Sequence, residues 1–144
     1  MNRLALILVL LVAGCGGGGG SKPLFTRQLG EWTVEVSKDG KAAAERDGNA
    51  SPGTIELRPL GPDPGSTAGP QPQVAVEIKA PAAIESPTLW VDDNVLLTKG
   101  AGPSNRFISI YGAPGKLGPG EHRVVAFAQA GGHGAAATWT FSVG

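Results

Sequence analysis

Few side chains that could carry out chemistry are clustered in this sequence. Asp92, Asp93 and Asn94 form a cluster of oxygen donors, the ligands that Ca²⁺ prefers. The two histidines, His122 and His133, are the nitrogen donors that a copper or zinc site would need. A calcium site takes about six to eight oxygens, so the cluster supplies only part of one. A polar β-turn accounts for the same cluster, and we expect the turn rather than a metal site.

Catalysis needs a nucleophile beside a base, or paired carboxylates in a cleft. Ser104, Ser109 and Ser142 fall in strand or turn patterns, without the sharp turn that exposes a nucleophile. Glu77 alternates with apolar residues, which places it on the polar face of a strand. We therefore expect no catalytic residue, no enzymatic activity and no small-molecule substrate.

Cys15 is the only cysteine, and its surroundings are distinctive. Arg3 precedes an unbroken apolar run from Leu4 to Ala13, and Gly14 comes directly before the thiol. The run has the length of a signal-peptide core, about half of the ~20 residues that a membrane-spanning helix needs. The segment Leu-Val-Ala-Gly-Cys at residues 11–15 resembles the lipobox of bacterial lipoproteins.

That resemblance implies that residues 1–14 are a signal peptide, cleaved between Gly14 and Cys15. It also implies that Cys15 carries a diacylglyceryl group and an N-acyl chain such as palmitate, the only cofactor we expect. Residues 15–23 then form a lipidated cysteine and a flexible Gly-rich tether. Two or more lipid chains make a stable anchor. We expect a protein on the bacterial cell envelope, at the outer membrane of a Gram-negative cell or the outer face of a Gram-positive cell membrane.

Composition excludes some functions and narrows the fold. Lys+Arg and Asp+Glu each number 12, so no excess of basic residues is available to neutralise phosphates, and we expect no nucleic-acid binding. A single cysteine cannot form a disulfide within the chain, although the expected compartment is oxidising. The 23 glycines and 12 prolines interrupt long helices and favour short strands joined by turns.

Alternating apolar and polar residues predict several strands. Residues 32–36 alternate, Lys38-Asp39-Gly40 predicts a tight turn, and residues 41–47 are either a returning strand or a helical turn. Residues 61–72 are rich in Pro and Gly and leave no room for a strand. Further strands are predicted at residues 54–58, 74–79, 88–92, 107–111, 122–130 and 137–143.

Three stretches of the C-terminal half carry a family resemblance. Residues 88–93 (TLWVDD) resemble a strand that ends in a "VDG" turn, and residues 117–122 (LGPGEH) are similar to the entry "L-x-x-G-x-H" of the next-to-last strand. Residues 137–143 (ATWTFSV) match a closing strand written "W-x-F-x-V". Together they resemble a bacterial immunoglobulin-like domain. The resemblance implies an all-β sandwich of about seven short antiparallel strands, with a role in adhesion, spacing or protein binding.

The sequence departs from that family at two turns. Asp93 stands where the family has glycine, and residues 130–133 replace an acidic loop that could supply calcium ligands. We divide the chain into an N-terminal β segment (residues 24–60) that packs on the sandwich, a connection (61–72) and an immunoglobulin-like core (73–144).

Aromatic residues offer a possible binding patch. Trp90 and Tyr111 would form one, together with Trp32, if they shared an exposed sheet face. The alternative, which we favour, is that the segment led by Trp32 folds over the Trp90 face and buries it.

These features predict a membrane-anchored envelope lipoprotein whose domain is a non-catalytic protein-binding, adhesion or scaffolding module. Its partners would be the membrane, through the lipid, and a protein or glycan of the envelope. One alternative is an envelope enzyme or an accessory protein that binds calcium or copper. Another is a structural spacer or accessory subunit of a larger envelope complex.

Overall fold

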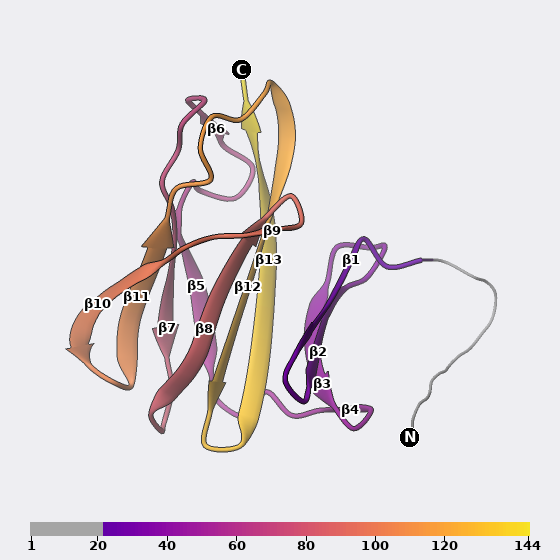
Figure 1. Ribbon diagram of the computed structural model, residues 1–144, viewed down its shortest axis with the longest axis vertical. Coiled ribbons are helices and arrows are strands. Elements are labelled where there is room, and N and C mark those ends of the chain that lie inside the picture. Colours follow the sequence, from indigo (N-terminus) through magenta and orange to yellow (C-terminus); the bar gives the residue numbers. More distant parts are fainter. Residues whose placement is uncertain (1–21) are drawn as a thin grey trace.

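A computed structural model describes residues 22–144 as three β-sheets stacked in layers, which confirms the predicted all-β class (Figure 1). Nowhere in this part of the chain is there a helix long and apolar enough to cross a membrane. The predicted signal peptide, the lipidation site at Cys15 and most of the tether lie outside the described residues.

The first layer is an N-terminal sheet of strand order β1-β2-β3-β4. Its strands are β1 (Phe25–Leu29), β2 (Trp32–Val36), β3 (Ala42–Arg46) and β4 (Asn49–Ala50). The turn before β3 ends at Gly40, whose φ of 84° suits glycine. The tight turn predicted from Lys38-Asp39-Gly40 is therefore confirmed. The returning segment is a strand, because Ala44 pairs with Val34 of β2.

The other two layers form a sandwich. One sheet has the order β10-β11-β7-β5, and the other has the order β6-β13-β12-β8-β9. The strands are β5 (Glu56–Gly61), β6 (Thr67–Ala68), β7 (Val74–Lys79), β8 (Ile84–Val91), β9 (Asn94–Val95), β10 (Lys99–Ser104), β11 (Phe107–Gly112), β12 (Gly120–Ala130) and β13 (His133–Val143).

The expected count of about seven strands was too low, because the two sheets of the sandwich hold nine in the described chain. β6 and β9 have two residues each, too few for an alternating pattern to reveal. The expected boundaries also shift. β5 belongs to the sandwich rather than to the N-terminal segment, and β6 lies within the 61–72 connection that was expected to hold no strand.

The main core lies between the two sheets of the sandwich. Val124, Ala126 and Ala128 of β12, which alternate along the strand, are buried here. Trp139 and Phe141 of β13 are in the same cluster and fill the space beside these smaller side chains. The indole nitrogen of Trp139 also donates a hydrogen bond of 2.9 Å to the carbonyl of Pro62, which ties the connection to the core.

A second core joins the N-terminal sheet to the outer face of the β12 sheet. Residues 124–128 of β12 are buried without interruption, because alternate side chains enter the two cores. Phe127 and Trp90 point into the second core, and Trp32, Val34 and Phe25 reach it from the N-terminal sheet. Figure 1 shows this sheet, in indigo to purple, beside the β13 side of the sandwich. One outer face of the sandwich is therefore covered.

Candidate functional site

The aromatic residues considered for a binding patch do not gather on the surface. Trp32 and Trp90 are only 2% and 3% exposed, and the Trp90 ring meets the ring of Phe25 edge-on at 5.2 Å. Tyr111 lies on β11, in the opposite sheet of the sandwich. The strand pattern places Trp90 on the outer face of its sheet, but that face is covered by the N-terminal sheet, as the favoured alternative has it.

In the polar cluster at residues 92–94, Asp92 and Asp93 form a two-residue hairpin turn and Asn94 begins β9. Val91 pairs with Asn94, and both Asp92 and Asp93 have positive φ angles, of 48° and 72°. Such a turn requires positive φ at both central positions, which aspartate tolerates better than most residues. The turn therefore accounts for the two aspartates, and the Asn94 side chain donates a hydrogen bond to the Asp92 carbonyl.

The carboxylate of Asp92 is occupied by groups of the chain itself. One oxygen accepts a hydrogen bond of 3.0 Å from the backbone N–H of Arg123, and the other is hydrogen-bonded to Nδ1 of His122. Nε2 of His122 is 2.7 Å from the carbonyl of Gly118. These two contacts raise the pKa of His122 above its usual value, the Asp92 contact being the larger cause.

The two histidines do not come together. His122 pairs with Phe141 near the start of β12, whereas His133 opens β13 and pairs with Ala130 at the other end of the hairpin. At about 3.3 Å per residue, the two imidazoles are held more than about 20 Å apart. Within residues 22–144 no three His, Cys, Asp or Glu side chains are grouped so as to hold a metal ion.

His133 has a partner that the sequence reading missed. Its Nδ1 lies 2.8 Å from Oγ of Ser51, in the segment that leads from the N-terminal sheet to β5. A β-bridge between Ser51 and Gly134 runs beside this contact. The Ser51–His133 contact and the bridge hold this segment against the β12–β13 hairpin. No local motif marks it, since 82 residues separate the two.

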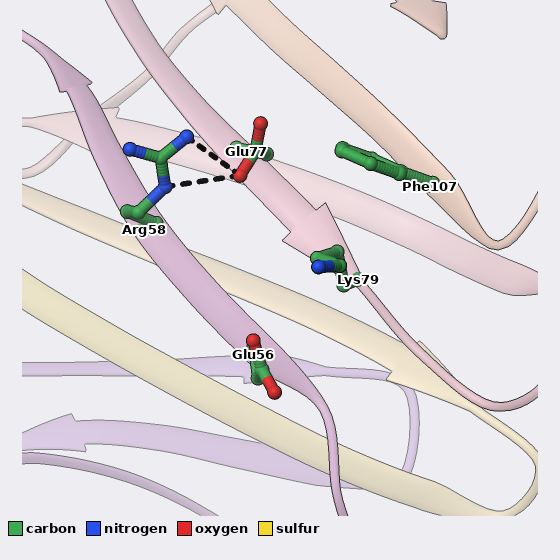
Figure 2. Close-up of a pocket in the computed structure, with 5 residues that line it drawn as sticks. All are labelled: Glu56, Arg58, Glu77, Lys79 and Phe107. Atoms are coloured by element: carbon green, nitrogen blue, oxygen red, sulfur yellow. Dashed lines mark hydrogen bonds and ion pairs between the residues drawn. The ribbon is translucent and has the colours of Figure 1, made fainter. Parts of the chain in front are cut away.

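Among residues 22–144, no element packs over the other outer face of the sandwich, that of the β10-β11-β7-β5 sheet. Glu56, Arg58, Glu77, Lys79 and Phe107 line a shallow depression of about 360 Å³ on this face (Figure 2). We call the surface made by these five residues the charged face. The register sets them in rows, with Glu56, Lys79 and Phe107 side by side in one row. Arg58, Glu77 and Ser109 form the adjacent row.

Alternation within three strands explains why these side chains share a face. Leu57, Ile78 and Ile108 turn toward the core, so their neighbours along each strand turn outward. Glu77 was expected on a polar strand face, and this is where it lies. The sequence could not show that β5 would lie beside β7 and supply Glu56 and Arg58, because residues 62–73 separate the two strands in the chain.

Polar contacts order part of the charged face. The guanidinium of Arg58 makes two contacts with Oε1 of Glu77, at 3.0 Å from Nε and 2.8 Å from Nη2. Arg58 is 66% exposed and Glu77 only 17%. The ammonium of Lys79 lies 5.2 Å from the centre of the Phe107 ring, within cation–π range. The face therefore holds two cations and two anions on β5 and β7, with one half-buried ring beside Lys79 on β11.

No protein-family model matches this sequence, and no curated protein matches it either. Among solved structures, the endo-beta-1,4-mannanase from Thermotoga petrophila is similar, with a TM-score of 0.52 and 13% identity. That match covers 64% of this chain but only 20% of the mannanase. CopC from Methylosinus trichosporium OB3b matches with a TM-score of 0.44 and 16% identity, over 61% of this chain and 93% of CopC. At 13% identity the similarity to the mannanase concerns the fold alone.

Proposed function

We propose that this chain is a membrane-anchored envelope lipoprotein whose immunoglobulin-like sandwich acts as a non-catalytic protein-binding module. Cys15, with small residues before it and glycines after it, supports the anchor. The charged face is its binding surface. The outer membrane, or the outer face of a Gram-positive cell membrane, is its location.

The observation that carries this proposal is the difference between the two outer faces of the sandwich. The face that bears Trp90 and Phe127 is sealed by the N-terminal sheet, through an apolar cluster. No described element packs over the charged face, where Glu56, Arg58 and Lys79 are exposed. One face is therefore used to complete the fold, and the other is left for contact with another molecule.

The chemistry of the charged face favours a protein partner over a glycan. Two carboxylates and two cations alternate there, and charge complementarity of this kind gives specificity in protein–protein contacts. Sugar rings are neutral and stack on exposed aromatic rings. The one ring of this face, Phe107, is half-buried and has Lys79 beside it.

Crosslinking of the full-length chain in its own membranes tests the proposal. The wild type should capture one stoichiometric protein partner. The double variant Arg58→Glu/Lys79→Glu should lose that partner, because like charges placed against each other disfavour association. The matched control is Lys38→Glu/Lys41→Glu, which makes the same change of net charge at exposed positions beside β2 and β3.

A Cys15→Ala variant tests the anchor separately. It should lose lipid labelling and leave the membrane fraction. Labelling of the wild type with a radioactive fatty acid should give one lipidated species.

If the wild type captures no protein, or if the Lys38→Glu/Lys41→Glu control loses the partner equally, the charged face is not the binding surface.

A further inference from the structure

We propose that the partner of the charged face is a second copy of this chain, bound in a two-fold symmetric dimer. The inference rests on the proposed function, because it takes the charged face as the binding surface. It adds the identity of the partner and the arrangement of the two molecules.

The charges of this face form a two-by-two checkerboard. Glu56 on β5 lies opposite Lys79 on β7 in the register, and Arg58 on β5 lies opposite Glu77. Each charge therefore has the opposite sign beside it, both along its strand and across to the next strand. Figure 2 shows the four side chains arranged in this way around the β5–β7 pair.

A checkerboard of this kind is complementary to itself. A two-fold axis that runs across the strands, midway between the two rows, exchanges the rows. It places Glu56 against Arg58 of the second copy, and Lys79 against Glu77 of the second copy. Such an axis gives an isologous interface, in which each contact occurs twice. All four charges then meet opposite charges, and the strands of the two facing sheets stay aligned, as in a β-sandwich.

The checkerboard also argues against a partner whose surface carries charges of one sign only. A partner with uniform charge, such as an anionic lipid surface, would place like charges against two of the four side chains. The mixed pattern is best met by a surface with the same alternation, and the chain itself carries one.

One charge of the face is left available for such a partner. Arg58 is engaged with Glu77 in the same molecule, and the ammonium of Lys79 lies over the Phe107 ring. Among the ion pairs of the described residues none involves Glu56, and in Figure 2 no interaction line reaches it. In the dimer, Arg58 of the second copy would approach Glu56 from the row opposite.

The size of the sheet predicts a weak dimer that depends on the membrane. Four strands of six residues form this sheet. At about 4.8 Å between strands and 3.4 Å per residue, its face measures about 400 Å². Stable complexes bury roughly 800 Å² on each partner. Molecules anchored to one membrane have a raised effective concentration, which compensates for a small interface.

Energy transfer between labelled copies of the lipidated chain in phosphatidylcholine vesicles tests the dimer. Ala113→Cys introduces a thiol for the donor or acceptor dye at an exposed position outside both rows. The wild type should show more energy transfer than a monomeric lipoprotein at the same surface density. Each of two variants, Arg58→Glu/Lys79→Glu and Glu56→Lys/Glu77→Lys, should associate with itself at least roughly tenfold more weakly, since its face is then of one sign.

The decisive sample is a mixture of the two variants. An acidic face and a basic face complement each other, so a donor-labelled variant mixed with the acceptor-labelled other should regain the wild-type transfer or exceed it. Circular dichroism of each variant shows that it is folded, and an unfolded variant could not regain transfer in the mixture. The Lys38→Glu/Lys41→Glu control should behave as the wild type.

The remaining outcomes overturn the dimer and separate it from the proposed function. A wild type without transfer, or a mixture that stays as weak as its components, overturns the second-copy partner. If crosslinking in native membranes then still joins the charged face to a different protein, the binding function stands and only the dimer fails. If no adduct forms with any protein, both fail.

Discussion

The indole nitrogen of Trp32 donates a hydrogen bond of 3.0 Å to Oε1 of Gln129, which joins the N-terminal sheet to β12 across 97 residues of sequence. The guanidinium of Arg46 lies over the same indole, 4.8 Å from its centre, and donates a hydrogen bond to the carbonyl of Gly132. A polar group among apolar side chains must be paired, so the bond to Gln129 fixes where the N-terminal sheet sits on the sandwich.

The first prediction concerns how much the Trp32 side chain contributes to the free energy of unfolding. Trp32→Ala should lower the free energy of unfolding by about 3–5 kcal/mol, because it removes a buried ring and leaves a cavity. Trp32→Phe keeps most of the apolar contact and should cost only about 1–2 kcal/mol, including the lost hydrogen bond. Urea unfolding of both variants checks this order. Lys41→Ala, exposed beside the same sheet, should change little, and a comparable loss there would contradict the assignment.

The second prediction concerns Gly134, whose backbone lies against the Trp32 ring. A Cβ atom at Gly134 would lie 2.8 Å from Cη2 of Trp32, closer than carbon atoms can approach. Gly134→Ala should therefore destabilise the chain by about 1–3 kcal/mol, through overpacking. Gly118→Ala is the control, because its Cβ would meet nothing within 4 Å.

The ring and the glycine should also be coupled. In the Trp32→Phe background, the smaller ring leaves room at Gly134, so the second substitution should cost less than it does in the wild type. A double-mutant cycle in urea measures this difference. Strictly additive losses would show that the strain of Gly134→Ala arises elsewhere.

The sequence predicts the strands well where burial on one face imposes alternation, as at Trp32, Val34 and Val36. It predicts less well how sheets assemble. The covering of Trp90 depends on β1 to β3 lying against β8 and β12, a pairing of faces that only tertiary packing decides. The charged face was missed for the same reason, since Glu56 meets Lys79 and Arg58 meets Glu77 only through the pairing of β5 with β7.

Turns were predicted best where the backbone conformation of the turn favours particular residue types. Asp92-Asp93 was expected to form a polar turn, and the positive φ angles of both residues explain the choice of aspartate. The Ser51–His133 contact had no such local signal, because neither residue type is unusual at its position. Long-range polar contacts of this kind have to be found in the structure.

The third prediction follows from the strain at Asp93. Its φ of 72° lies in the left-handed region, where glycine has no steric cost, and Asp-Gly is a preferred pair for this turn. Asp93→Gly should leave stability unchanged or raise it by about 0.5 kcal/mol. The exposed ion pair with Arg27, at 3.7 Å, is worth little, and the bond from Arg27 to the Asp93 carbonyl is retained.

The matching change in the opposite direction is Asp93→Val. A β-branched side chain is poorly tolerated at positive φ, so this variant should lose more than about 1 kcal/mol. Thermal unfolding of the two variants beside the wild type gives the comparison. Equal stability of the glycine and valine variants would show that the turn relaxes without strain.

The last prediction is a pH dependence that arises from His122. Its hydrogen bonds to Asp92 and to the Gly118 carbonyl raise its pKa in the folded chain above the usual value of 6.5. A base whose pKa is raised by folding stabilises the fold fully below its unfolded pKa. That stabilisation is lost as the pH rises through the higher folded pKa. Wild-type stability relative to His122→Gln should therefore be constant at acidic pH and should decline from about pH 6.5 upward.

Urea midpoints of the wild type and His122→Gln between about pH 5 and 9 give the difference, in which other titrating groups cancel. Asp92→Asn tests the cause, because it keeps the turn and the bond to Arg123 but removes the negative charge beside the imidazole. In that variant the His122 pKa, followed by its ring proton shifts in NMR, should fall toward the usual value. An unchanged pKa would place the origin of the shift in the Gly118 carbonyl instead.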